Sequence, residues 1–231
     1  MLYPIIKIIH ILAGATALVT GLIAMLTLKG GKAHRFNGKL YFWSMTIIFV
    51  SSIYMSLFKE MIFGVLIALF SFQAAFNGYR ILYLKKLTQG QKAGTLDYIG
   101  LIVGALAAIF MLYLGIINAS KNNTAGIVLL VFGAFYTLGV WNEYRKFKKP
   151  PTEKMFWIYK HIGQMGGAYI ATTTAFLVNN YRLFPFLPEV VLWLLPTAVG
   201  AVIITVVTKK YKKRQSNNSP AGFSVAPLAG G

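Results

Sequence analysis

The chain has 231 residues, of which 57% are hydrophobic and 12% are charged, with a formal net charge of +18 and no cysteine. This composition excludes a water-soluble globular domain, and the absence of cysteine excludes disulfides, thiolate nucleophiles and zinc–thiolate sites. The apolar residues form seven separate stretches, each long enough to cross a hydrocarbon layer of about 30 Å as a helix.

Seven transmembrane helices are predicted, because the stretches are continuously apolar and do not alternate as the strands of a β-barrel would. In chain order they cover residues 5–28, 40–58, 61–84, 99–117, 125–141, 155–178 and 190–208. The expected fold is all-α, a polytopic integral membrane protein with one seven-helix domain over residues 1–214. Residues 215–231 carry no charge and are rich in Ser, Asn, Pro, Ala and Gly, so we expect a disordered C-terminal tail.

Basic residues are concentrated on one side of the predicted bundle. Nineteen of them lie near the connections after 5–28, 61–84 and 125–141 or at the C-terminal end. The opposite side has only four, which are Lys7, Lys59, Lys121 and Arg182. Since cytoplasmic loops are enriched in Lys and Arg, we expect the N-terminus outside and the C-terminus in the cytoplasm. The positive charge then reflects topology, so the expected partner is the lipid bilayer and no nucleic acid is expected.

Polar side chains within the third predicted span are candidate binding residues. Each polar group costs free energy in lipid unless it has a partner or faces a cavity. Gln73, Asn77 and Arg80 follow one another at helical spacing, so they form one polar stripe on a helix otherwise rich in Ile, Leu and Phe. This stripe is expected to face the interior of the bundle.

The sixth predicted span carries a second polar stripe, with His161 and Gln164 on one face. If the third and sixth helices adjoin, the two stripes converge in the inner leaflet, with His34 of the first cytoplasmic loop above them. The predicted ligand-binding site consists of His34, Asn77, Arg80, His161 and Gln164, with Gln73 and His10 as secondary candidates. Hydrogen bonds between helices are the alternative role for these side chains.

The three histidines are the candidate metal ligands. His10 is expected either to bond across helices or to ligate a metal or haem. It lies near the outer boundary and His161 near the inner one, which makes them poor partners for one haem in a membrane about 30 Å thick. His34 and His161 form the easier pair, and Asp97 and Glu143 are the only carboxylates that could join them. Haem or a metal ion is the candidate cofactor.

Three function classes remain open. The first is a ligand-binding or redox-accessory protein that holds haem, a metal ion, a quinone or a lipid headgroup in the inner leaflet. The second is a small-solute transporter or channel, which needs a continuous polar path, and the third is a non-catalytic scaffold subunit. None of the five acidic residues falls within a predicted span, which disfavours a proton-coupled carrier. The pattern assigns no catalytic residue.

Several of these residues belong to a pattern that resembles a known family. The pattern comprises His10-Ile-Leu-Ala-Gly14, Lys29-Gly-Gly-Lys-Ala-His34-Arg35, Gly38-Lys-Leu-Tyr41, His161-Ile-Gly-Gln-Met165 and Thr174-Ala-Phe-Leu-Val-Asn179. It resembles an uncharacterised family of bacterial predicted membrane proteins, a domain of unknown function whose most specific element is the His-Arg-x-x-Gly loop. Many relatives carry His-Trp-Met near the third connection, whereas residues 85–98 here contain no histidine. The resemblance implies a multi-pass protein of the bacterial inner membrane and supplies no reaction.

Overall fold

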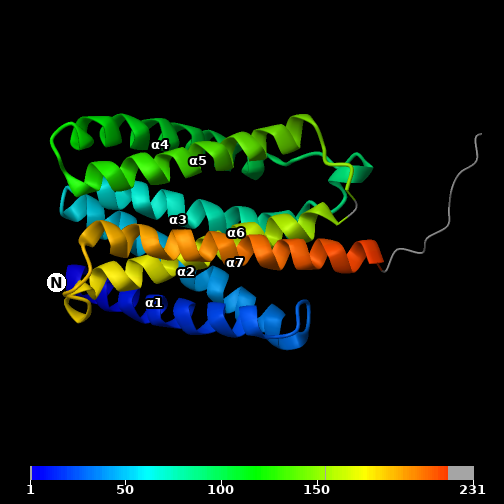
Figure 1. The fold of residues 1–231 in the computed structure, drawn as a ribbon, viewed down its shortest axis with the longest axis horizontal. Coiled ribbons are helices and arrows are strands. Elements are labelled where there is room, and N and C mark those ends of the chain that lie inside the picture. The colour runs from blue at the N-terminus through cyan, green and yellow to red at the C-terminus, as the bar shows by residue number, and fades with distance from the viewer. Residues whose placement is uncertain (1, 154, 218–231) are drawn as a thin grey trace, which may run out of the picture.

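The computed structural model describes residues 2–153 and 155–217, which form seven long α-helices (Figure 1). In chain order these are α1 (Leu2–Leu26), α2 (Lys32–Phe58), α3 (Ile62–Arg80), α4 (Thr95–Ala119), α5 (Thr124–Lys148), α6 (Phe156–Asn179) and α7 (Glu189–Asn217). The short helical turns in the connections are η1 (Ile81–Tyr83), η2 (Leu87–Gln89) and η3 (Tyr181–Leu183). The predicted all-α, seven-helix fold is confirmed.

Three helices extend by seven or more residues beyond the apolar stretches that predicted them. α2 begins at Lys32 instead of residue 40, so His34 lies in the first turn of a helix and its predicted place in a loop is wrong. α5 continues to Lys148 and α7 to Asn217. Lys and Arg are good helix formers, so a helix need not end where its apolar part ends. α7 thus includes the first three residues of the expected disordered tail, and the rest of that tail lies outside the described residues.

The helices pack mainly as consecutive pairs. α1 packs against α2, α4 against α5, and α6 against α7, while α3 contacts α2, α4 and α6. As a result, the connections after α1, α3 and α5 lie at the same end of the bundle as the C-terminal part of α7 (Figure 1). We call this the basic end, because it carries the concentration of Lys and Arg described above.

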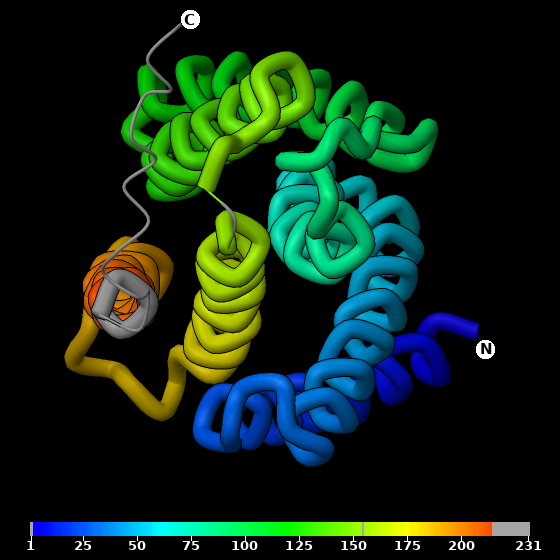
Figure 2. Tube along the Cα trace, turned by 90° about the vertical axis from the view of Figure 1, so that its right-hand side faces the viewer, coloured from blue at the N-terminus to red at the C-terminus, as the bar shows by residue number. Residues whose placement is uncertain are grey.

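Six of the described helices are long and apolar enough to cross a membrane, and α6 is the exception. With 24 residues α6 has sufficient length, but Lys160, His161, Gln164 and the threonines at 172–174 reduce its apolar character. α6 contacts α1, α3 and α7, and it lies among the other helices in Figure 2. This position explains why α6 is less apolar than the other six helices, because a helix surrounded by protein can carry polar groups that lipid would not solvate.

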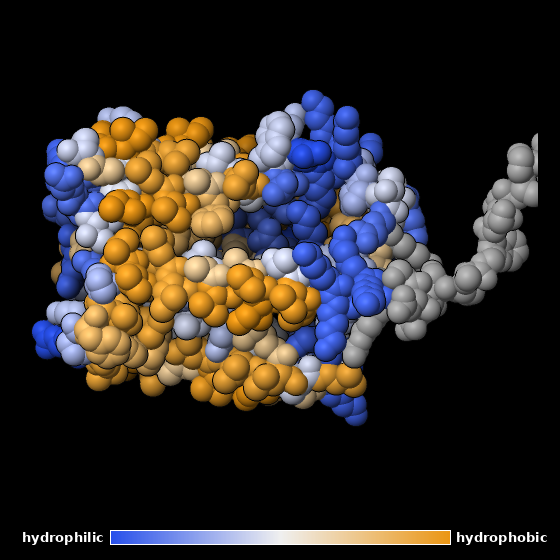
Figure 3. Space-filling model, in the orientation of Figure 1, coloured by the Kyte–Doolittle hydropathy of each residue, from blue (hydrophilic) through white to orange (hydrophobic). Residues whose placement is uncertain are grey.

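The buried apolar core lies mainly in the half of the bundle opposite the basic end. Side chains of α3, α4 and α5 interdigitate there, and the buried members are Leu66, Ala107, Ala108, Met111, Val128, Leu129, Phe132 and Tyr136. A smaller cluster joins α1, α2, α3 and α6 through Ala17, Tyr41, Met45, Ala75 and Ala168. The outer surface over the middle of the helices is also apolar (Figure 3), as expected for side chains that contact lipid.

Candidate functional site

α3 and α6 lie side by side, which confirms the adjacency that the predicted site required. Gly78 of α3 allows this close contact, since a Cβ there would lie only 2.7 Å from Sδ of Met165 and 3.1 Å from its backbone nitrogen. The predicted residues do not share one chamber, however. They divide into two groups on different sides of the α3–α6 contact, which we call the amide cavity and the histidine pair.

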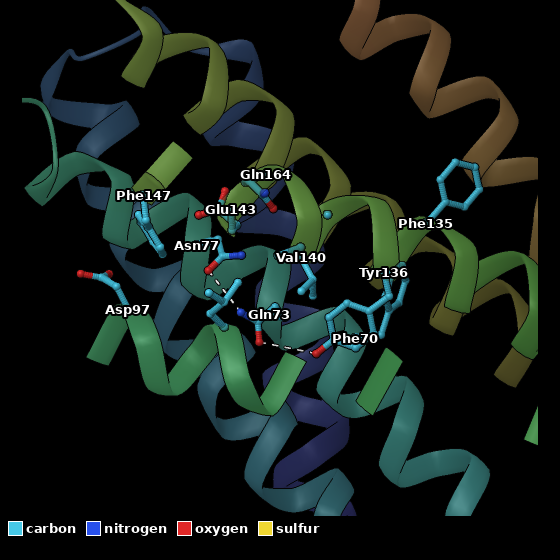
Figure 4. A pocket seen from close by; sticks show the side chains of 13 residues that line it. Phe70, Gln73, Asn77, Asp97, Phe135, Tyr136, Val140, Glu143, Phe147 and Gln164 are labelled. Atoms are coloured by element: carbon cyan, nitrogen blue, oxygen red, sulfur yellow. Dashed lines mark hydrogen bonds between the residues drawn. The ribbon is translucent and has the colours of Figure 1, made fainter. Parts of the chain in front are cut away.

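The amide cavity is a space of ≈ 90 Å³ between α3, α4, α5 and α6 (Figure 4). Its polar lining consists of Gln73, Asn77, Asp97, Tyr136, Glu143 and Gln164, and aromatic rings contribute much of the remaining wall. Of the predicted site residues, the structure therefore brings together Gln73, Asn77 and Gln164. A cavity of this size accommodates roughly three water molecules or a small polar ligand.

The hydrogen bonds inside the amide cavity are long. Gln73 Nε2 donates to Asn77 Oδ1 at 3.3 Å, and the Tyr136 hydroxyl donates to Gln73 Oε1 at 3.5 Å. These distances exceed the usual range of about 2.7–3.2 Å for N–H···O bonds, so the amides keep much of their capacity to bind a ligand. Every buried side-chain N or O atom of the described residues has a partner, so the remaining amide atoms are accessible from the cavity.

Two glycines of α4 make room for Gln73. A Cβ at Gly104 would lie 3.4 Å from the Gln73 carboxamide, and a Cβ at Gly100 would lie 3.4 Å from its Nε2 and 3.0 Å from Phe76. Gly100 and Gly104 form a GxxxG pair, which is typical of close helix contacts in membranes. This sequence signal identifies the face of α4 that borders the cavity.

A buried ion pair closes the cavity toward the basic end. Arg80 Nε and Nη2 donate to the two carboxylate oxygens of Asp97 at 2.9 Å each, and the Gly94 amide donates to Asp97 Oδ2 at 2.8 Å. The Asp97 side chain is only 3% exposed. The structure thus places Arg80 beside the cavity, where it orients a carboxylate, and the cavity lining itself does not include it.

A second buried ion pair lies on α5, where Lys146 donates to Glu143 and both side chains are almost completely buried. Lys160 of α6 interacts electrostatically with both. Sequence reasoning missed this cluster, because the predicted span ended at residue 141 and both residues were assigned to the membrane boundary. The sequence did contain a signal for this cluster, because Glu143 and Lys146 have opposite charges and are three residues apart, a spacing at which side chains on a helix interact.

The histidine pair joins α2 and α6 at the basic end. His34 Nδ1 lies 2.8 Å from the carbonyl oxygen of Ala24, and His161 Nδ1 lies 2.8 Å from that of Gly78. A carbonyl oxygen only accepts hydrogen bonds, so both Nδ1 atoms carry a proton, and the neutral form of either ring has its lone pair on Nε2. The ring centres are 6.1 Å apart. Neither Nε2 has a hydrogen-bond partner among the described residues, so both are accessible to a ligand.

The surroundings of the histidine pair are cationic. Lys29 donates to the carbonyl oxygens of Ala24 and Met25, and partial burial lowers the pKa of Lys29. Lys85 lies 4.4 Å from the centre of the Trp157 ring, and both lysines interact electrostatically with His161. Within the described residues, neither Lys29 nor Lys85 forms an ion pair with a carboxylate.

The predicted participation of Asp97 and Glu143 in a metal site with the histidines is wrong. Both carboxylates are engaged by cationic partners, Asp97 by Arg80 and Glu143 by Lys146. Within residues 2–153 and 155–217, no three His, Asp or Glu side chains are close enough together to hold a metal ion. Among the described His, Asp and Glu side chains, a metal ion at the histidine pair would therefore have two ligands, His34 and His161.

His10 lies away from both groups and forms a hydrogen bond between α1 and α2. Its Nδ1 lies 2.9 Å from Oγ of Ser51, which in turn donates to carbonyl oxygens of its own helix. This is the structural role that the sequence allowed for His10.

Replacing His10 by alanine should therefore lower the free energy of unfolding in mixed micelles without changing any bound ligand. Hydrogen bonds between transmembrane helices contribute about 0.6 kcal/mol on average, so a coupling of this size is expected between His10→Ala and Ser51→Ala in a double-mutant cycle. Additive effects of the two substitutions would show that the hydrogen bond contributes nothing to stability.

A family described as "Predicted membrane protein (DUF2306)" matches residues 7–142, which is more than half of the chain. The chain belongs to this family. The predicted resemblance is confirmed, and with the membrane-spanning helices it makes this a multi-pass membrane protein in contact with the lipid bilayer. No curated protein and no solved structure matches the chain.

The family region covers only part of the two groups of polar residues. It includes α1 to α4 and most of α5, with His34, Gln73, Asn77 and Arg80. α6 follows it, so His161 and Gln164 lie outside the matched residues. Both the histidine pair and the amide cavity therefore combine residues of the matched DUF2306 region with residues of the helix beyond it.

Proposed function

We propose that this DUF2306 protein is a redox-accessory protein of the bacterial inner membrane that holds a haem iron between His34 and His161. The observation that carries the proposal is that each of the two imidazoles has its Nδ1 held by a backbone carbonyl oxygen. Histidines that bind metals typically donate their second ring N–H to such a group, which fixes the tautomer and the ring position. Both Nε2 atoms then have free lone pairs.

The spacing of the rings supports a shared metal centre. Metal–imidazole bonds are about 2.0–2.1 Å long, so two rings on opposite sides of one ion have their centres roughly 6 Å apart. The observed separation is 6.1 Å. His34 is in the first turn of α2 and His161 is on α6, so the two ligands would come from separate helices that the bundle fixes relative to each other.

Haem suits this site better than a bare metal ion. A bare ion would obtain only two protein ligands here and would lie among cations. Haem iron takes four ligands from the porphyrin and needs only two axial ones. Its two propionates are anionic, so Lys29 and Lys85 would stabilise them.

The proposed coordination suggests a role in electron transfer. With both His34 and His161 bound to it, a haem would supply one-electron transfer and would leave no place for a substrate or for oxygen. The bound group would therefore exchange electrons rather than activate a ligand. The excess of Lys and Arg at the basic end supports a cytoplasmic location for that end, and thus for the proposed haem.

The test is the visible absorption spectrum and the metal content of the protein purified after expression with added haem precursor. We expect a Soret band and about one haem per chain. His161→Asn should abolish the band, because its amide nitrogen occupies the place of Nδ1 and keeps the bond to Gly78, whereas Nε2 is lost. His34→Asn should have the same effect, and His10→Asn should leave the spectrum unchanged.

Two outcomes would contradict the haem assignment. A colourless protein with stoichiometric zinc or copper that is lost in His161→Asn would mean that the pair holds a bare ion. A colourless and metal-free protein, or one that keeps haem in both variants, would remove the histidine pair as a metal site. The unfolding free energies of the variants must be compared alongside, because a general loss of structure would also release haem.

The amide cavity supports a second candidate function, the binding or movement of a small polar solute. Asn77, Gln164 and Gln73 would be the ligand-binding residues, since their amides have unused hydrogen-bonding capacity. Transport additionally needs a continuous polar path. The apolar core of α3, α4 and α5 lies between the cavity and the end opposite the basic end, with Phe132 and Met111 fully packed. Binding is therefore better supported than transport.

A further inference from the structure

A separate groove lies between α5 and α7 at the basic end. Near the opposite end these helices are in contact through Trp193, whose ring centre lies 6.1 Å from that of Phe132. Toward the basic end they diverge, and a groove of ≈ 870 Å³ opens between α5, the start of α6 and α7. We call it the α5–α7 groove. Figure 3 shows a hydrophilic hollow between the apolar surfaces of the two helices on this face.

The α5–α7 groove is strongly basic. One acidic residue lines it, Glu153, which pairs with Lys212 at 3.2 Å. Six of the described basic residues line it, which are Arg145, Lys146, Lys148, Lys149, Lys160 and Lys212. The groove thus has an excess of positive charge, which favours an anionic occupant.

The floor of the groove also has an uncompensated charge. Lys146 and Lys160 both interact with Glu143, so two cations share a single carboxylate. Lys146 forms the ion pair with it, and Lys160 forms no ion pair within the part of the chain that the structure describes. Lys160 is partly buried, and a partly buried ammonium in a low-dielectric region is stabilised by an anion brought next to it.

The rim of the groove is apolar and aromatic. Trp141 of α5 is 55% exposed at its edge, and Leu138, which lies two turns before Arg145 on the same face of α5, is 58% exposed. A soluble anion would use the basic floor and none of this rim. An amphiphile would use both, since its charged group would meet the lysines and its hydrocarbon chains would meet the apolar face of α5.

We propose that the α5–α7 groove binds an anionic phospholipid, with the headgroup phosphate against Lys160 and the acyl chains along the exposed apolar face of α5. Basic pockets between transmembrane helices are a recognised way of binding anionic headgroups. The site is independent of the histidine pair, so it stands whether or not the protein binds haem.

The experiment is native mass spectrometry of the full-length protein in detergent, titrated with phosphatidylglycerol or phosphatidylcholine. We expect preferential retention of phosphatidylglycerol. Lys160→Met should weaken that retention about fivefold, which corresponds to the roughly 1 kcal/mol that one basic residue near an anionic lipid contributes. Lys121→Met, on an exposed loop at the opposite end, is the matched control and should bind as the original protein does. Excess inorganic phosphate should not displace the lipid.

A second variant covers the case in which Lys160→Met fails to fold. Arg145 and Lys148 are exposed in the groove wall, so Arg145→Gln with Lys148→Gln should keep the fold and still lower phosphatidylglycerol retention. Equal retention of the two lipids, or unchanged retention in the folded groove variants, would overturn the proposal. Displacement by inorganic phosphate would overturn it as well, because the groove would then be a site for soluble anions.

Discussion

Replacing Asp97 by alanine is expected to lower the free energy of unfolding by about 3–5 kcal/mol, the cost typical of removing one partner of a buried ion pair. Asp97 accepts two hydrogen bonds from Arg80 and one from the Gly94 amide. The alanine variant would leave the Arg80 guanidinium without its counter-ion between α3 and α4. It would also remove the hydrogen bond at the first turn of α4.

The measurement is unfolding in mixed micelles, with an exposed ion pair as the control. Glu153 and Lys212 have side chains that are each 50% exposed, so Glu153→Ala should cost no more than about 1 kcal/mol. Replacing both partners of the buried pair, as in Asp97→Leu with Arg80→Met, should recover most of the loss, because apolar substitutes avoid an unpaired charge. A single variant as stable as the original protein would show that the pair contributes little to the fold.

This ion pair also gives Arg80 a more specific role than the sequence did, because its guanidinium orients a carboxylate. Its position on the polar stripe of α3 suggested a ligand-binding residue, but its partner Asp97 comes from α4 and lies seventeen residues further along the chain. The spacing of polar residues shows which face of a helix they share. It does not show which side chain of a neighbouring helix that face contacts. The pairing depends on how α3 and α4 pack, which no local pattern records.

The division of the predicted site into two groups has a similar physical origin. His161 and Gln164 are three residues apart, so they differ by about 60° around the axis of α6. This angle is enough to turn His161 toward the Gly78 carbonyl and His34, and Gln164 into the amide cavity. The adjacency of α3 and α6 was predictable from two matching polar stripes, whereas the direction of each side chain was not.

The contribution of α5 was missed for a different reason. Tyr136 is surrounded by apolar residues in the sequence, and Glu143 follows the last of them, so the two resemble a membrane-anchoring aromatic residue and a boundary charge. They are seven residues apart, which is two helical turns, and both line the amide cavity. Glu143 lines the cavity because α5 continues past residue 141, and the composition of this segment alone did not reveal that continuation.

The tightest contact between α4 and α5 leads to the second large effect, at Gly126 in the first turn of α5. A Cβ at this position would lie 2.2 Å from the Ala119 backbone nitrogen and 2.5 Å from the Asn118 carbonyl carbon. These are backbone atoms, so no side chain can move aside to relieve the clash. Gly126→Ala should therefore destabilise the protein by about 3 kcal/mol, the upper end of the usual range for overpacking.

Gly139 on the same helix supplies the matched control, because a Cβ there would meet nothing within 4 Å. Gly139→Ala should raise the unfolding free energy by roughly 0.5–1 kcal/mol, since alanine loses less conformational freedom in a helix than glycine does. The same substitution is thus expected to have opposite signs at two positions of α5. If both variants were stabilised to the same extent, helix propensity alone would govern these sites, and α4 and α5 could not be packed backbone to backbone at Gly126.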